Sequence, residues 1–285
     1  MFYIFLSILC SVAVAVLLKL FNRYSIDSLQ AIIINYPTAL ILSYLFFKPD
    51  LQIVGQHSNL LPEYTILALL LLSLFYFISR SITYSGMVIT AVAQRLSLLI
   101  PVLAAFILFG EQLNPIKIAG LLTGFLAIIL SLPYTKNEDG NKKASVFFPL
   151  IVFSGTGVID VLFNRLAQNK EVPFTTALST VFGIAMFLGF IVLAYLFTTG
   201  KSKFSLKTAI GGLLLGSFNF FSIIFYLKAL HLESTKPSVI FSALDVGVIT
   251  LGSIVGFFIF SEKLSLRNKL GILVAIISII IFSFA

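Results

Sequence analysis

Apolar runs long enough to cross a lipid bilayer dominate this sequence. A spanning helix needs about 20 mostly apolar residues, and charged and turn residues divide the chain into ten such runs. Of the 285 residues, 59% are hydrophobic and only 11% are charged, whereas a soluble domain carries about 25% charged residues. The sequence therefore predicts an all-α integral membrane protein with ten transmembrane helices. Their expected ranges are 2–21, 29–47, 64–83, 87–109, 115–133, 147–166, 173–198, 208–229, 237–260 and 268–285.

The charged residues and the single cysteine exclude several classes of protein. The net charge is +8, but lysine and arginine are scattered over short segments, which indicates loops facing lipid headgroups and no nucleic-acid partner. Cys10 alone cannot form an intrachain disulfide or a cysteine-based metal site, and His57 and His231 show no metal spacing. We therefore expect no cofactor and no metal. The N-terminus lacks a positive segment before its apolar run, so we expect a retained first helix in a multi-pass protein of the cell inner (plasma) membrane.

An internal repeat divides the ten expected helices into two halves. Phe-Gly-Glu-Gln-Leu at 109–113 matches Phe-Ser-Glu-Lys-Leu at 260–264, and Leu-Phe-Asn-Arg occurs at both 20–23 and 162–165. Five helices is an odd number, so the second half enters the bilayer from the opposite side. Such inverted repeats are common in transporters, with the substrate site near the midplane. The expected divisions are a first five-helix repeat at 1–133, a polar linker at 134–146 and a second five-helix repeat at 147–285.

These features resemble the EamA-type transporters of the drug/metabolite transporter (DMT) superfamily. The resemblance covers the whole chain and includes the glutamates that close helices four and nine, the segment 226–237 before helix nine, and Pro101 in helix four. It implies ten helices in two halves, cytoplasmic termini, and transport of amino acids, sugars, nucleotide sugars, organic phosphates or drugs. The chain departs from the family pattern twice. Asn35 replaces a frequent arginine in helix two, and Gly252 stands where the repeat partner has Pro101.

Ionisable residues deep inside the apolar runs mark the candidate site, because such charges are costly in a membrane and are functional by default. At about 1.5 Å of rise per residue, Arg95 and Asp245 each lie about 6 Å from the centre of their helix, on opposite sides of the midplane. The resulting axial gap of roughly 12 Å predicts no direct ion pair without movement. Asp160 is expected on the Asp245 side, about 4 Å from the midplane.

These three residues together favour a binding site for a small molecule. A guanidinium suits a carboxylate or a phosphate, and two carboxylates at similar depth can share a proton, as proton coupling requires. We therefore expect Arg95, Asp245 and Asp160 to line a central cavity for a small polar metabolite with both signs of charge, such as an amino acid. The alternative is that Arg95 and Asp245 only satisfy local partners such as Gln94, Asn35 or backbone carbonyls.

Further candidate substrate-binding residues are Gln94, Asn35 and Tyr36. Asn35 and Tyr36 precede Pro37 in helix two, where a proline frees a backbone carbonyl and a kink can shape a cavity. Asn219 in helix eight favours an interhelical hydrogen bond. Four further basic residues near helix ends are expected to reach toward the membrane interface; they are Lys19, Arg80, Arg165 and Lys228. For Glu111 and Glu262 we expect a structural role, in which each carboxylate satisfies free amides at the start of the next helix.

The orientation in the membrane stays open. Lysines and arginines near the loops after odd-numbered helices outnumber those on the other side by twelve to six. The positive-inside rule therefore puts the termini outside the cell, whereas the family resemblance puts them in the cytoplasm.

The expected activity is secondary active transport by alternating access, and not an enzymatic reaction. The chain lacks a Gly-x-x-x-x-Gly-Lys-Ser/Thr motif for ATP, so a gradient or substrate exchange must drive it. The first alternative is a flippase for a lipid-linked carrier on the same scaffold. A membrane enzyme would need an Asp or His cluster near one interface, and a purely structural protein would not need such deep charges. Glycine pairs such as Gly120 and Gly124 allow close packing within a monomer or across a homodimer.

Overall fold

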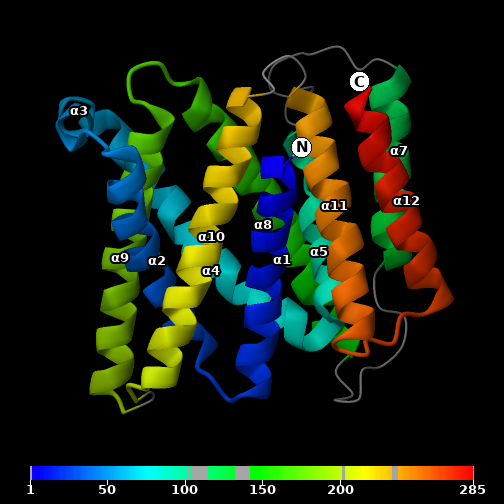
Figure 1. Ribbon diagram of the computed structural model, residues 1–285, viewed down its shortest axis with the longest axis horizontal. Helices are drawn as coiled ribbons and strands as arrows, with labels where there is room; N and C mark the ends of the chain where they lie inside the picture. Colours follow the sequence, from blue (N-terminus) through cyan, green and yellow to red (C-terminus); the bar gives the residue numbers. More distant parts are fainter. Residues whose placement is uncertain are drawn as a thin grey trace.

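The computed structural model is a bundle of long helices that run side by side (Figure 1). It describes residues 2–101, 103, 115–131, 142–200, 203–232 and 237–284, and within these ranges it is helical and contains no strand. The helices are α1 (Phe2–Arg23), α2 (Ser28–Phe47), α3 (Leu51–Gln56), η1 (Ser58–Leu60), α4 (Leu61–Ser85), α5 (Met87–Leu96), α7 (Pro115–Ser131), α8 (Lys142–Gln168), α9 (Phe174–Thr198), α10 (Leu206–Leu232), α11 (Pro237–Phe258) and α12 (Leu266–Ser283).

The protein is a helical membrane protein. In the described ranges, six helices are long and apolar enough to cross a bilayer. Large apolar side chains such as Leu45, Phe187 and Phe258 are exposed on their outer faces, where contact with lipid removes the cost of exposing them to water. Each of the ten predicted runs also contains a helix or part of one, and both termini lie at the same end of the bundle (Figure 1).

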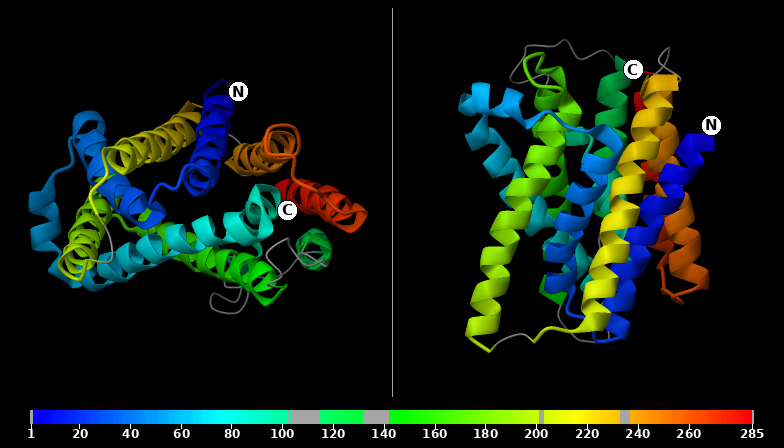
Figure 2. Two further views of the ribbon diagram at one scale, coloured as in Figure 1. Left: turned by 90° about the horizontal axis from the view of Figure 1, so that it is seen from below. Right: turned by 60° about the vertical axis from the view of Figure 1, so that its left-hand side comes forward.

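The helices form two rows when the bundle is seen end-on (Figure 2). One row contains α10, α1 and α11, and α1 packs against both neighbours. The other row contains α4, α8 and α5, and α8 packs against both of its neighbours. At one side of these rows α2 packs against α9 and α10, and at the opposite side α7 packs against α12. This arrangement brings α5 of the first half beside α8 and α11 of the second half.

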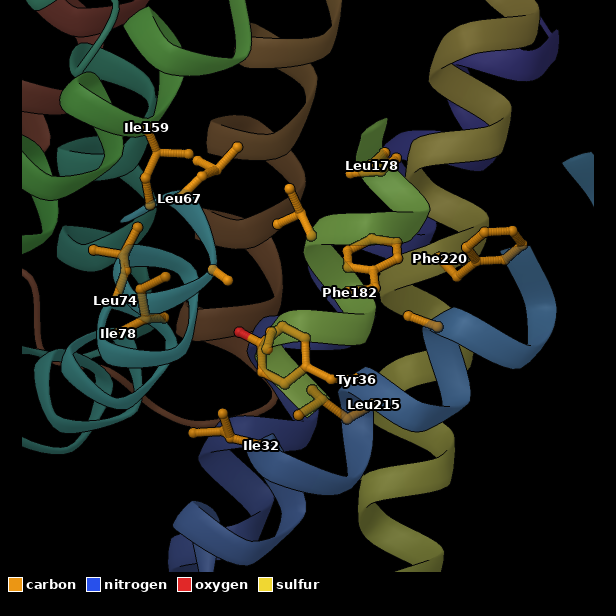
Figure 3. Close-up of a cluster of buried hydrophobic side chains, with 14 of the residues drawn as sticks. Ile32, Tyr36, Leu67, Leu74, Ile78, Ile159, Leu178, Phe182, Leu215 and Phe220 are labelled. Carbon is orange, nitrogen blue, oxygen red and sulfur yellow. The ribbon is translucent and has the colours of Figure 1, made fainter. Parts of the chain in front are cut away.

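The largest apolar core lies among α2, α4, α8, α9 and α10. Figure 3 shows Tyr36, Phe182 and Phe220 within it, and the hydroxyl of Tyr36 points toward side chains of α4. Tyr36 and Phe75 pack edge to face, with their ring centroids 6.4 Å apart. Two glycines of α10 allow α10 to pack closely against α2. A Cβ at Gly212 would lie 2.8 Å from a backbone oxygen of α2, and a Cβ at Gly216 would lie 2.7 Å from another.

The helix predicted at 87–109 is interrupted, because α5 ends at Leu96, a turn follows at 97–98, and residues 99–101 are helical again. Pro101 explains the break: proline has no N–H, and its ring crowds the carbonyl four residues earlier, which belongs to Ser97. The Ser97 hydroxyl donates instead to the Gln94 carbonyl, at 2.6 Å. The Ile100 N–H donates to the Ser97 carbonyl at 2.9 Å. This bond joins residues three positions apart, so the turn is tighter than a turn of α-helix, in which bonded residues are four positions apart.

Two other boundaries differ from the sequence prediction. Helix α8 begins at Lys142, inside the predicted linker 134–146. The charged residues at its start were predicted to end the apolar span, but charged residues at a membrane surface can continue a helix. The interval between the predicted helices 29–47 and 64–83 contains α3, whose first turn is capped by Asp50: the Asp50 carboxylate accepts the Gln52 N–H at 3.0 Å. The linker residues 134–141 lie outside the described ranges.

Candidate functional site

An ion pair between the two halves of the chain forms the centre of the candidate site. The Arg95 guanidinium on α5 donates to the Asp245 carboxylate on α11, with Nη1 and Oδ1 3.0 Å apart. The two residues are 150 positions apart in the sequence. The predicted absence of a direct ion pair is therefore wrong.

The relative register of α5 and α11 explains this correction. Gly256 packs against Val88 and Gly252 against Ala91, so the antiparallel helices place Arg95 level with Val248. Asp245 then lies only about three residues, or roughly 5 Å, farther along the axis. The long arginine side chain spans that remainder. The sequence estimate measured depth from the centre of each predicted helix, and so could not include this register between α5 and α11.

Asp160 on α8 joins the ion pair through the turn that ends α5. Its carboxyl oxygen Oδ2 lies 3.0 Å from the Ser97 hydroxyl, which also donates to the Gln94 carbonyl. Asp160 also lies within electrostatic range of both Arg95 and Asp245. The predicted trio Arg95, Asp245 and Asp160 is thus brought together in one cluster.

The sequence reasoning missed Ser97 and Tyr226. Ser97 gave no signal until the break before Pro101 was known, because a serine in an apolar run is common. Tyr226 on α10 lies within electrostatic range of Arg95, Asp160 and Asp245. It was already part of the segment that resembles the EamA family, which was the one available signal.

The cluster remains accessible although it lies inside the bundle. The Arg95 side chain is 26% exposed and that of Asp245 is 18% exposed, whereas Ser97 is buried. Unsatisfied charge is not tolerated against lipid, so charges at membrane depth face a water-filled space or one another. The geometry therefore brings a guanidinium and two carboxyl groups together where α5, α8 and α11 meet, with both members of the ion pair partly exposed.

Of the other predicted binding residues, Asn35 and Tyr36 form no hydrogen bond or ion pair with this cluster among the described residues, and Gln94 reaches it only through its backbone. Gln94 contributes its backbone carbonyl, as described above. Asn35 is fully buried and accepts a hydrogen bond from the Asn219 amide at 3.2 Å, which is the interhelical bond expected for Asn219. The Asn35 amide nitrogen and the Tyr36 hydroxyl are buried without a hydrogen-bond partner among the described residues.

Glu262 joins three elements at the end of the bundle opposite the termini. Its carboxylate accepts the N–H groups of Met87 and Val88, at 2.7 and 3.2 Å, and pairs with the Lys19 ammonium of α1. The expected role for Glu262, satisfying free amides at a helix start, is confirmed, but the helix is α5 and not the next helix, α12. Gly86, at φ 89°, leaves room for the carboxylate. Glu111 lies outside the described residues.

Comparison with known proteins gives a family. No family model matches the sequence. The chain is 37% identical to a Haemophilus influenzae protein described as uncharacterized, over 281 residues that cover 96% of this chain and 94% of that protein. This chain belongs to the family of that Haemophilus influenzae protein.

The fold is also shared with a protein solved by crystallography. That structure covers 98% of this chain and 94% of its own chain, with a TM-score of 0.61 and 12% sequence identity. At this identity the likeness shows the fold alone. Neither protein has a described activity, so these comparisons point to no function for this chain.

Proposed function

We propose that this protein is a secondary active transporter of the EamA type, which moves a small polar metabolite across the cell inner membrane by alternating access. The observation that carries the proposal is the cluster of Arg95, Asp245 and Asp160. Four helices, α5, α8, α10 and α11, supply its charged and polar groups. Neither charged partner of the central ion pair is fully buried. Charges at such depth are costly, and a path for a polar solute is the usual reason for keeping them.

The pattern of helix contacts supports two equivalent halves. In the proposed repeat, α1, α2, α4, α5 and α7 correspond in that order to α8, α9, α10, α11 and α12. When each helix is replaced by its counterpart, the contact α1–α10 becomes α8–α4, and the contact α1–α11 becomes α8–α5. The same exchange turns α2–α10 into α9–α4, and α5–α7 into α11–α12. Each of these pairs is in contact. This correspondence favours an inverted repeat of five helices, with ten spans in all and the site where the halves meet.

The charges of the cluster favour a substrate that carries both signs. An amino acid-like molecule would place its carboxylate on the Arg95 guanidinium, displacing Asp245 from the ion pair. Its ammonium group would lie between Asp245 and Asp160. Because the substrate replaces one charge pair by two, binding and the rearrangement of α5 against α11 are coupled, as alternating access requires.

A ligand screen by thermal unfolding tests the proposal. The probes are amino acids, sugars, sugar phosphates, nucleotide sugars and lipophilic cations, with a short prenyl phosphate for the flippase alternative. A ligand at 100 times its dissociation constant stabilises the protein by about 2.7 kcal/mol. The expected result is stabilisation by a zwitterion in the wild-type protein that is absent in the double variant Arg95→Gln/Asp245→Asn. The double variant removes both members of the ion pair, so neither of them is left without its partner.

The matched control is Arg165→Gln, since Arg165 is 76% exposed and pairs at 3.4 Å with Glu63 near a helix end. It should respond to the ligand as the wild-type protein does. Stabilisation that survives unchanged in the double variant would remove the ion pair from the binding site. Stabilisation by the prenyl phosphate alone would favour the flippase.

A further inference from the structure

A polar cavity lies at the end of the bundle opposite the termini, where the turn between α1 and α2 meets the start of α10 (Figure 1). Its volume is about 300 Å³. Helix α10 comes close to this turn because Gly211 has no side chain: a Cβ there would lie 2.9 Å from the Phe21 ring. The residues that line the cavity do not include those of the cluster around Arg95, so the cavity is a separate site.

The segment that leads into α10 separates polar from apolar side chains. Lys203, Ser205 and Lys207 line the cavity. The residues that alternate with them, Phe204 and Leu206, are each 69% exposed. Two ammonium groups therefore lie at the cavity, beside large apolar side chains that are suited to contact with lipid.

Buried polar side chains hold this arrangement in place. Gln30 of α2 is 2% exposed, and its Nε2 donates to the Lys203 carbonyl at 3.0 Å and to the Asp27 carboxylate at 3.1 Å. Thr208 also lines the cavity and is 2% exposed, and its hydroxyl has no hydrogen-bond partner among the described residues. Since a buried hydroxyl is normally hydrogen-bonded, Thr208 needs an acceptor inside the cavity.

The charges at the cavity select an anion with one negative charge. The charged residues that line it are Lys203, Lys207 and Asp27, which leave one net positive charge. The Asp27 carboxylate caps α2 by accepting the N–H groups of Leu29 and Gln30, whereas neither lysine forms an ion pair among the described residues. A phosphodiester group carries one negative charge, and its oxygens accept hydrogen bonds from ammonium and hydroxyl groups.

An apolar stripe on α10 begins at the cavity and favours a lipid as the source of this phosphate. Its members are exposed and recur every three or four residues, so they share one face of the helix; they are Leu206, Ile210, Leu213 and Leu214. Basic pockets between membrane helices suit anionic lipid headgroups. We propose that the cavity binds the phosphate group of an anionic phospholipid, with an acyl chain along this stripe. The proposal is independent of the transport site.

Native mass spectrometry of the delipidated protein in detergent, titrated with dioleoyl phosphatidylglycerol, tests the proposal. Lys203→Gln/Lys207→Gln should weaken binding of the first lipid roughly 30-fold, because each lysine near a lipid phosphate contributes a factor of about five. Thr208→Val keeps the shape and the charge of the site, and should weaken binding about tenfold. The matched control, Lys48→Gln/Lys170→Gln, removes two exposed lysines from other loops and should bind the lipid as the wild-type protein does.

The choice of lipid separates the possible sources of the phosphate. Dioleoyl phosphatidylethanolamine has the same chains but no net charge, and should bind more weakly; equal binding would overturn the proposal. Glycerol 3-phosphate has the phosphate without the chains. If it displaces the lipid at equal concentration, the cavity takes a soluble phosphate compound and the assignment to lipid is wrong. Equal weakening in the two double variants, or unchanged binding in Thr208→Val, would also overturn the proposal, because general charge attraction would then explain the binding.

Discussion

Glu262→Ala is the substitution whose effect the structure predicts most directly. The carboxylate accepts two N–H groups at the start of α5 and pairs with Lys19, so three elements lose a common partner. Loss of a helix cap costs about 1 kcal/mol, and a hydrogen bond to a charged group contributes about 1.5–3 kcal/mol. The Lys19 side chain is 22% exposed, so hydration of its ammonium group in the variant offsets part of the free energy lost with the ion pair. We therefore expect a loss of about 3 kcal/mol, taking the cap and a reduced ion-pair contribution together.

The assay is thermal unfolding of the purified protein in one detergent. A loss of that size should lower the unfolding midpoint by roughly 6–12 °C. Glu262→Gln keeps an oxygen for the amides and loses only the ion pair, so it should lower the midpoint by roughly a third as much. The control is Glu171→Ala: its side chain is 57% exposed and lies 4.0 Å from His57, so a change below about 0.5 kcal/mol is expected.

If Glu262→Ala unfolds at the same midpoint as Glu171→Ala, the carboxylate does not hold α5 and the reasoning is refuted. A second check is Lys19→Met, which leaves both amide bonds in place. It should destabilise the protein less than Glu262→Ala does, and a larger effect would show that the ion pair matters more than the helix cap.

Three further substitutions follow from the contacts. Arg95→Gln alone should destabilise by about 3–5 kcal/mol because it leaves Asp245 unpaired, whereas Arg95→Gln/Asp245→Asn should cost much less; equal losses in chemical unfolding would argue against the ion pair. Gly86→Ala should cost about 1–3 kcal/mol because the backbone is at φ 89°, and an unchanged unfolding midpoint would contradict this. Gly216→Ala places a Cβ 2.7 Å from the Asn35 carbonyl and should cost about 1–3 kcal/mol; Gly55→Ala, where the space is open, is its control in the same measurement.

The sequence was sufficient for the class of protein and the approximate position of each helix. A membrane-spanning helix must be apolar over about 20 consecutive residues, because its backbone groups bond internally and its side chains face lipid. That requirement is local and can be counted along the chain. It also marked Arg95, Asp160 and Asp245 as exceptional, since each lies inside such a run.

Only the tertiary structure decided how these charges are used. The bond between Arg95 and Asp245 depends on the register of two helices from different halves and on the break at Ser97, neither of which is a local property. The amides that Glu262 satisfies belong to α5, which precedes it by more than half of the chain. Depth along a helix limits which residues can meet, but the packing of helices distant in sequence determines which of them do.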